Sequence, residues 1–272
     1  MARAAVVLCA LFGVACSDNP YVIGRAAVDA AAADAGADAG ADAGSDAGSD
    51  GGVDAGRGEC AAEHALALVC SGFESPDLLA DWDGTDTRPG GMLERTTART
   101  RTGAGALRAS SAAMMIAAVV SKRIGPIVSG DVYVRLYLYV AAGLPTRTMN
   151  FMFVGDYPMP DPFVGIDFNL LDGALQVFSP QGNPVRQTGS VLIPRDRWFC
   201  LRAHVAVRDD AGFVQLFVDD MLALEATDID TLPPAGVREL RVGIDWSSGQ
   251  DDPFELYIDD VVLDTAPVAC AP

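Results

Sequence analysis

The sequence predicts an all-β fold, an antiparallel two-sheet jelly-roll sandwich, preceded by a signal peptide and a disordered linker. Three observations predict it. Apolar and polar residues alternate over many short segments after residue 130, which is the period of half-buried strands. Clusters of Gly, Pro and Asp separate these segments, as in antiparallel sandwiches. A stretch before residue 60 is mostly Ala, Asp and Gly, a composition that cannot form a core.

Residues 1–16 are predicted to be a lipoprotein-type signal peptide. Arg3 precedes an apolar stretch, 4–15, that is too short to span a bilayer and has the plan of a secretory signal. Residues 12–16, Phe-Gly-Val-Ala-Cys, resemble a bacterial lipobox, and the resemblance implies lipidation of Cys16. Gly13 stands where leucine is usual, and a plain signal peptide with a nearby cut is the alternative. We expect an exported protein, an outer-membrane or cell-surface lipoprotein that meets the membrane only through its lipid anchor.

Residues 17–59 are predicted to be a disordered linker. From residue 34 to residue 54 an aspartate recurs at every fourth position, usually with a glycine two residues later. Aspartates at this spacing would repel one another on one helix face, and the glycines would weaken a helix further. A calcium-binding glycine–aspartate repeat is the alternative, but such repeats need a large apolar residue in each unit. A charge-extended tether fits better.

The charge balance excludes some partners. The chain has 272 residues, with 37 acidic and 19 basic side chains and a formal net charge of −18. Residues 60–272 are acidic in their own right, with 28 acidic and 16 basic side chains. Nucleic acids and anionic membrane surfaces need a positive footprint, so we expect neither as a partner. An acidic polysaccharide is also disfavoured, unless Arg135 and Arg202 form a local exception.

Residues 60–272 are expected to form one domain, long enough to enclose a single core. Turn signals lie at 172–173, 181–184, 209–212 and 233–236. Helix candidates are confined to 63–69 and 111–119, and the second is equally a strand. Alternation predicts strands at 132–140, 150–154, 163–170, 174–178, 199–207, 214–218, 240–244 and 254–258.

The cysteine count agrees with export. Without Cys9 and Cys16, four cysteines remain in the domain. An even number in an exported protein predicts two disulfides, with three pairings open. We expect Cys60–Cys70 and Cys200–Cys270, the second closing a large loop. A metal site is the alternative, but no Cys-x-x-Cys spacing occurs.

Several motifs resemble those of a known superfamily. They are Cys-Ser-Gly-Phe-Glu-Ser at 70–75, Trp82, Tyr-Val-Arg-Leu-Tyr at 133–137, Trp-Phe-Cys-Leu-Arg at 198–202, Val-Gln-Leu-Phe-Val-Asp-Asp at 214–220 and Leu-Tyr-Ile-Asp-Asp-Val at 256–261. In this order they resemble the concanavalin A-like lectin/glucanase superfamily, including its laminin-G-like jelly rolls, over about residues 70–265. Asp220 stands where the hairpin of that family usually has glycine, which predicts a longer turn.

The resemblance also implies a structural calcium ion. Smaller carbohydrate-binding jelly rolls that share the Phe-Glu opening and the Asp-Asp-Val close often hold calcium with these acids. Glu74, Asp259 and Asp260 are therefore metal candidates, since calcium needs several oxygen ligands. A solvated acidic edge is the alternative, because further acids lie nearby at Asp251, Asp252, Glu255 and Asp264.

A glycan-binding face is the second candidate site. Tyrosine rings can stack on sugar C–H groups, and guanidinium groups bind hydroxyls or carboxylates. The alternative is that these tyrosines belong to the core or its rim. The ligand-binding candidates are Tyr133, Arg135, Tyr137, Tyr139, Arg202, His204 and Trp246, with Asp167, Asn169, Gln176 and Asp245 as extensions.

Catalysis is the third candidate. Polysaccharide lyases of the superfamily use a tyrosine or histidine base with a nearby arginine, so the resemblance implies Arg135, Tyr137 and His204 as catalytic candidates. A glycosidase needs two carboxylates at a defined separation, and the sequence shows no persuasive pair.

These observations favour a surface-tethered, non-catalytic binding module, with carbohydrate as its expected ligand. The alternatives are a polysaccharide lyase of the jelly-roll type and a structural or adhesive envelope lipoprotein that binds an envelope or extracellular protein.

Overall fold

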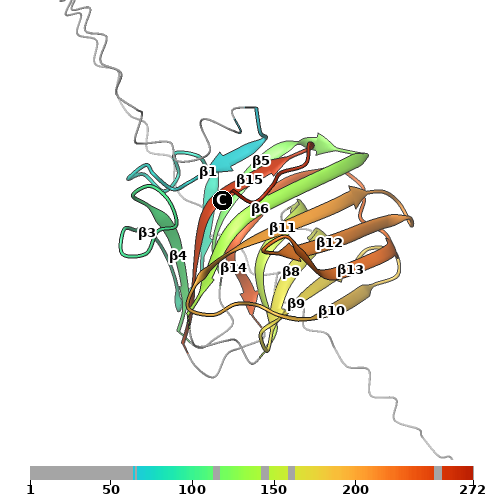
Figure 1. Cartoon of the computed structure of the whole chain (residues 1–272). Coiled ribbons are helices and arrows are strands. Elements are labelled where there is room, and N and C mark those ends of the chain that lie inside the picture. Colours follow the sequence, from blue (N-terminus) through green and yellow to red (C-terminus); the bar gives the residue numbers. More distant parts are fainter. Residues whose placement is uncertain are drawn as a thin grey trace, which may run out of the picture.

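The structure, a computed structural model, describes residues 64, 66–112, 117–141, 147–158, 163–247 and 253–271. These residues form fifteen strands in two antiparallel sheets, and they contain no helix (Figure 1). Within this part of the chain, no helix has the length and apolar character to cross a membrane. The predicted all-β sandwich is confirmed. The predicted signal peptide, Cys16, the linker and Cys60 lie outside the described residues.

Sheet A is the eight-stranded sheet, with the order β13-β12-β11-β6-β15-β4-β3 and with β1 also paired to β15. Its strands are β1 (Val69–Ser71), β3 (Gly91–Thr96), β4 (Ala106–Ser111), β6 (Gly130–Val140), β11 (Trp198–Val207), β12 (Gly212–Val218), β13 (Met221–Ile229) and β15 (Phe254–Asp264).

Sheet B is the seven-stranded sheet, with the order β10-β9-β8-β7-β14-β5-β2. Its strands are β2 (Gly84–Thr87), β5 (Ala118–Ile127), β7 (Met149–Asp156), β8 (Val164–Leu171), β9 (Ala174–Ser179), β10 (Val185–Leu192) and β14 (Val237–Ser247).

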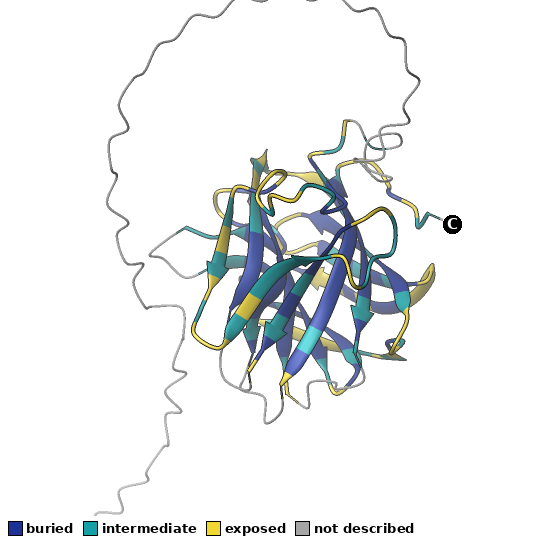
Figure 2. Ribbon diagram, turned by 90° about the vertical axis from the view of Figure 1, so that its left-hand side faces the viewer, coloured by how far each residue is buried: buried dark blue, intermediate teal, exposed yellow. Residues whose placement is uncertain are grey.

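The core lies between the two sheets. Alternate residues of each strand point inward, as the period of two requires, and most of the strand surface is buried (Figure 2). Leu138 of β6, Phe168 of β8 and Val242 of β14 are fully buried in one continuous cluster. The residues that flank each of these three in sequence point to the outer face of their sheet, where the candidate sites lie.

The strands predicted from strong alternation are present, but β1, β2, β3, β4, β10 and β13 were not predicted. β2 has the sequence Gly-Thr-Asp-Thr, and β10 alternates poorly because most of its side chains are exposed. Both lie at sheet edges, where few positions need an apolar side chain. Neither predicted helix appears among the described residues: β1 begins at Val69, and the segment 111–119 contributes the end of β4 and the start of β5.

The hairpin between β12 and β13 corrects the expectation of a longer turn. Only Asp219 and Asp220 connect the strands, with φ values of 47° and 66°. A two-residue turn with both φ values positive matches the twist of the strands that it joins. Aspartate tolerates this conformation better than most residues, so no extra residue is needed.

The C-terminal residues fold back over the outer face of sheet A. Cys270 forms the predicted disulfide with Cys200 of β11, across a sequence separation of 70. The hydroxyl of Tyr137 donates to the carbonyl of Ala271 at 2.8 Å. In Figure 1 the C-terminus lies in front of β15 and β6. The expected Cys60–Cys70 pair stays a prediction, because Cys60 is not among the described residues.

Candidate functional site

Polar side chains gather on the outer face of sheet B. Arg241 lies between the core residues Leu240 and Val242, and Asp167 lies between Ile166 and Phe168. Alternation along each strand therefore turns these polar residues away from the core. We call this surface the polar face and define it by Asp86, Asn150, Asp167, Asn169, Gln176, Glu239, Arg241, Asp245 and Trp246.

Arg241 is the electrostatic centre of the polar face. Its Nη2 lies 2.6 Å from Asp245 Oδ1 and 3.3 Å from Asp86 Oδ2, and its Nη1 lies 3.6 Å from Glu239 Oε1. Burial alone would lower the pKa of Arg241, but the carboxylate of Asp245 and further negative partners raise it above its ordinary value. The guanidinium therefore stays charged, and three carboxylates already occupy its donors.

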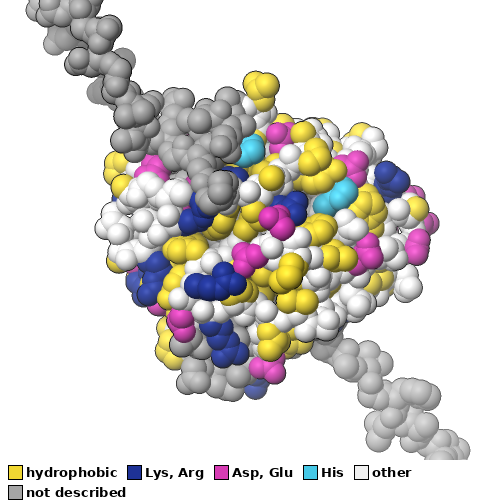
Figure 3. All heavy atoms as spheres, in the orientation of Figure 1, with side chains coloured by type: hydrophobic (Ala, Val, Ile, Leu, Met, Phe, Trp, Pro, Cys, Tyr) yellow, Lys and Arg dark blue, Asp and Glu magenta, His cyan; other side chains and the backbone are white. Residues whose placement is uncertain are grey.

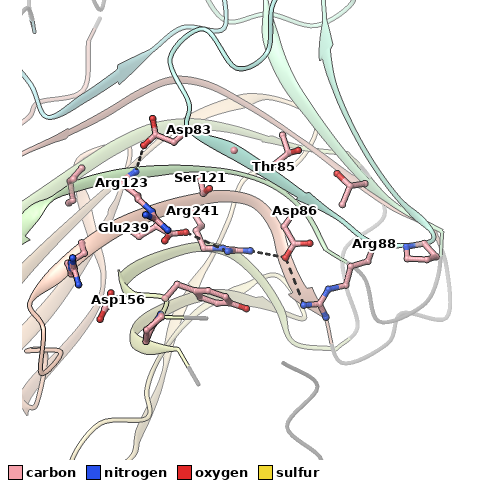
Figure 4. A pocket seen from close by; sticks show the side chains of 16 residues that line it. Asp83, Thr85, Asp86, Arg88, Ser121, Arg123, Asp156, Glu239 and Arg241 are labelled. Carbon is pink, nitrogen blue, oxygen red and sulfur yellow. Dashed lines mark hydrogen bonds and ion pairs between the residues drawn. The ribbon is translucent and has the colours of Figure 1, made fainter. Parts of the chain in front are cut away.

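A groove of about 960 Å³ opens beside Arg241, along β2, β5 and the start of β14. Figure 4 shows Arg88 and Arg241 reaching Asp86 from opposite sides. Arg123 and Arg238 are exposed members of its lining. The four arginines that line the groove are matched by four acids, namely Asp83, Asp86, Asp156 and Glu239.

Tyr157 lines one side of the groove and belongs to a cluster of aromatic rings. The guanidinium carbon of Arg241 lies 4.2 Å from the ring centroid of Tyr157. Phe153 meets the Tyr157 ring edge-on at 6.0 Å, and Phe163 stacks on it at 6.5 Å. Burial, with the negative charge of Asp245, raises the pKa of Tyr157 to about 12. Its hydroxyl is therefore protonated at neutral pH.

A row of amide side chains crosses the polar face. Asn150 of β7 pairs with Asn169 of β8, which pairs with Gln176 of β9. Gln176 is well satisfied, because its Nε2 donates to Thr188 Oγ1 at 3.0 Å and its Oε1 accepts from Arg186 Nη1 at 2.8 Å. The row is buried, an unusual position for amides on the outer face of a sheet.

Asp167 lies beside this row and is also buried. Its burial raises the pKa well above the usual 3.8, and the charge of Asp245 raises it further, while Arg186 and Asn150 act in the opposite direction. The folded protein thus holds a proton at Asp167 that the unfolded chain releases above about pH 4. The contribution of Asp167 to the free energy of unfolding therefore falls as the pH rises from about 4 towards the raised pKa of the folded protein.

We expect Asp167→Asn to reduce this pH dependence. An asparagine cannot titrate, so the variant should gain stability relative to wild type as the pH is raised from 4 towards 8. Thermal melts across this range measure the difference. Asp172→Asn, in the exposed turn after β8, is the matched control and should leave the wild-type slope in place. Parallel melting curves for wild type and Asp167→Asn would contradict the assignment.

The ligand face predicted from sequence is divided between the two sheets. Strand pairing places Tyr133 beside His204 and Arg135 beside Arg202 on the outer face of sheet A. Trp246 lies on β14 of sheet B, together with Asp245, so the prediction of one continuous face is wrong. Alternation within a strand shows which residues share a face, but it does not show which strands share a sheet.

The C-terminal segment covers the centre of the sheet A candidates. Arg135 is 1% exposed and donates from Nη1 to the carbonyl of Ala269 at 3.3 Å, and Tyr137 is 4% exposed beneath the same segment. His204 is within 2.9 Å of Asp131 and stacks on Tyr133. The strands of the predicted catalytic group Arg135, Tyr137 and His204 do adjoin, but a substrate cannot reach two of the three.

The remaining sheet A candidates are engaged with other side chains. Arg99 lies 3.8 Å over the ring of Tyr139, and Arg202 pairs with Asp220 at 2.8 Å. Acidic, basic and hydrophobic side chains are interspersed on this side of the molecule (Figure 3). Nothing on the described part of this face gathers charge of one sign, so Arg202 does not form the local basic exception considered above.

The predicted metal residues are brought together. A Cβ added at Gly72 would lie 3.5 Å from Asp260 Oδ1 and 3.6 Å from Glu74 Oε1, so both carboxylates converge on this glycine. Glu74 Oε2 accepts from the backbone of Ala104 at 2.7 Å, but Glu74 Oε1 is buried without a hydrogen-bond partner. An orphaned carboxylate oxygen beside a second carboxylate fits a bound cation.

Asp259 differs from the other two acids. It accepts hydrogen bonds from the backbone nitrogens of Arg101 and Asp260, both at 2.8 Å. Its burial, and then the charge of Asp260, raises its pKa to about 8. Asp260 pairs with Arg101 Nη1 at 3.2 Å and accepts from Thr102 Oγ1 at 2.9 Å. Asp259 therefore accepts hydrogen bonds from the local backbone, whereas Asp260 is the acid that faces Glu74.

A second acidic group was missed from the sequence. Asp209, Asp210 and Asp230 bring carboxylate oxygens within 4.8 Å of one another and could hold a metal ion. Thr231 joins the two loops, because its Oγ1 accepts from the backbone of Arg208 at 2.9 Å. The contact joins residues 23 apart in sequence, so spacing alone gave no signal.

The groove residues were also missed, although one signal was present. Glu239 and Arg241 alternate with Leu240 and Val242 in the sequence, which placed two charged residues on one face of a buried strand. Their partner Asp86 is 155 residues from Arg241 and lies on β2, the short strand that alternation did not reveal.

Comparisons with known proteins show the fold. No family model and no curated relative matches the chain. Among solved structures, an endo-β-1,4-glucuronan lyase from the fungus Trichoderma reesei has a TM-score of 0.60 and 13% identity, covering 69% of this chain and 92% of its own. The cellulose induced protein Cip1 has a TM-score of 0.57 and 14% identity, with coverages of 75% and 100%. Identities this low show a shared jelly-roll sandwich alone.

Proposed function

We propose that this domain binds carbohydrate without chemical conversion, in the groove of the polar face. The observation that carries the proposal is the groove itself, which combines exposed guanidinium groups with the aromatic ring of Tyr157 and with hydroxyl side chains. Such surfaces are suited to sugars, because rings stack on C–H groups and guanidinium groups bind hydroxyls. The shared fold with a glucuronan lyase, an enzyme named for a polysaccharide, supports the same ligand class.

Tyr157 and Asp245, the groups closest to Arg241, favour binding over catalysis. A general base should have a pKa near the working pH, whereas Tyr157 has a pKa of about 12. The carboxylate of Asp245 is committed to Arg241. The histidines lie elsewhere, His204 on sheet A and His64 before β1. These features support a binding module.

A polysaccharide lyase is the second candidate. The observation in its favour is the stack of Arg241 on Tyr157, because lyases need an arginine beside a tyrosine base. Incubation with uronate polymers would distinguish the two candidates. We expect no rise in the ultraviolet absorbance of unsaturated uronates, and a rise that Tyr157→Phe abolishes would replace the binding module by the lyase.

Exposed groove arginines should matter for binding. We expect Arg123→Ala combined with Arg238→Ala to weaken carbohydrate binding at least tenfold, because charge-assisted hydrogen bonds to the ligand are lost. Titration calorimetry with oligosaccharides identified on a glycan array measures the change. Arg208→Ala, an exposed arginine after β11, is the control and should bind like wild type. An array without any bound glycan would leave the protein-partner alternative and overturn the proposal.

The proposal includes a structural calcium ion held by Glu74 and Asp260. The orphaned Oε1 of Glu74 supports it. We expect millimolar calcium to raise the melting temperature and Glu74→Gln to abolish the rise, because binding to the folded state alone stabilises it. Asp230→Asn is the control for the second acidic group. A rise that depends on Asp230 instead, or no rise at all, would contradict the assignment.

The proposal also retains surface attachment. The sequence of residues 1–16 supports lipidation at Cys16, and the composition of residues 17–59 supports an extended tether. Such a tether would hold the binding groove away from the membrane. Fractionation of cells that express the chain with Cys16→Ser tests the anchor: the variant should be released in soluble form, whereas unchanged membrane association would contradict it.

A further inference from the structure

The amide row contains polar groups that the protein leaves without partners. Asn150 is 1% exposed, and the hydrogen bond that its side chain gives Asp167, which lowers the pKa of that acid, lies outside strict hydrogen-bond geometry. No other partner of its Oδ1 or Nδ2 occurs in the described structure. Trp246, directly opposite Asn150 on β14, also has a buried Nε1 without a partner.

Two side chains with unpaired polar atoms lie side by side in the sheet, which points to a ligand. Buried polar groups are almost always paired, and an unpaired one destabilises the fold. Asn150 and Trp246 are register neighbours, so their unused groups can meet the same ligand. Trp246 is the partly exposed member of the pair, and it gives the ligand a route from solvent.

The unused groups have a definite chemistry. They are two kinds of neutral donor, an amide nitrogen and an indole nitrogen, and one neutral acceptor, the amide oxygen. A sugar hydroxyl both donates and accepts, and the indole ring offers a surface for sugar C–H groups. An anion is disfavoured, because the carboxylate of Asp245 lies nearby and the donors of Arg241 are taken by carboxylates.

We infer that Asn150 and Trp246 form a subsite for a neutral sugar unit of the bound chain. The inference rests on the proposed function and narrows its ligand to neutral polysaccharides. Arg241 at the groove and Trp246 at the subsite lie five positions apart on β14, or roughly 16–17 Å at strand spacing. One oligosaccharide lying along β14 can therefore occupy both. The balance of four arginines and four acids in the groove agrees with an uncharged ligand.

The test separates a ligand group from a structural one. Asn150→Leu removes the orphaned amide at similar volume, so the melting temperature should stay the same or rise. If Asn150 binds sugar, the affinity for a neutral hexasaccharide should nevertheless fall at least tenfold. Trp246→Phe removes only the indole N–H and part of the ring, and it should weaken binding several-fold. Asn183→Leu, in the exposed loop after β9, is the control.

The probes are cellohexaose, xylohexaose and mannohexaose, with hexamers of glucuronate and mannuronate as acidic counterparts, titrated into the purified protein. Binding of a neutral hexamer that both variants weaken supports the subsite. A tenfold preference for a uronate hexamer, or wild-type affinity in both variants, overturns the subsite and leaves the proposed function standing. If no hexamer binds wild type, both fail. If Asn150→Leu does not fold, Trp246→Phe alone decides.

Discussion

Removal of the Cys200–Cys270 disulfide should lower the free energy of unfolding by roughly 4 kcal/mol, from the loop-closure entropy of a crosslink across a sequence separation of 70. Cys200 is 3% exposed, so Cys200→Ala combined with Cys270→Ser avoids burying a hydroxyl. For a domain of this size the melting temperature should fall by about 10 °C. Urea denaturation and thermal melts measure both quantities.

The same variant tests the cover over sheet A. Without the disulfide, hydrogen bonds and the packing of Val268 still hold the C-terminal segment against Arg135 and Tyr137. The wild-type protein melted in a reducing buffer should show at least a comparable loss, because reduction also breaks the disulfide of Cys70. A change below about 1 kcal/mol would mean that the segment contributes little and that the crosslink constrains nothing.

Arg241→Met should destabilise the domain by about 3–5 kcal/mol, because it leaves the carboxylate of Asp245 buried without its cation. Asp245 is 4% exposed and lies 2.6 Å from the guanidinium. Adding Asp245→Asn to Arg241→Met removes the unpaired buried charge and should recover most of the lost stability. Denaturant unfolding of the two single variants and the double variant measures the coupling.

The double variant is the decisive control. If Arg241 acts as the counter-ion of a buried acid, the double variant is more stable than Arg241→Met. If the double variant is as unstable as the sum of the two single changes, Arg241 stabilises the sheet through packing alone, for example against Tyr157, and the electrostatic account of the polar face is wrong.

The sandwich could be predicted because alternation is a direct record of burial. The segment 132–140 alternates without a break, and β6 runs from Gly130 to Val140. β10 could not be predicted in the same way, because a strand at a sheet edge with exposed side chains carries no apolar period. The β12–β13 turn was misjudged because aspartate, and not glycine, holds both left-handed positions.

The candidate site was harder to predict than the fold. Tyr133, Arg135 and Tyr137 do share one outer face, but alternation cannot show that a terminal segment covers it. The predicted Cys200–Cys270 disulfide already implied that the C-terminal segment covers this face. Cys200 pairs in register with Tyr137, so a bond from Cys200 to Cys270 requires the C-terminus to lie over the tyrosine. The groove on sheet B is built around the ion pair of Asp86 with Arg241. This pair spans 155 residues and leaves no local pattern in the sequence.

We propose that carbohydrate binds to the polar face of sheet B and not to the outer face of sheet A. Hydrogen exchange of backbone amides, followed with and without the tightest-binding hexasaccharide, tests it most directly. We expect added protection in β5, β7 and β14 and in the segment around Tyr157. Added protection in β6, β11 and β12 instead would place the ligand on sheet A and contradict the claim.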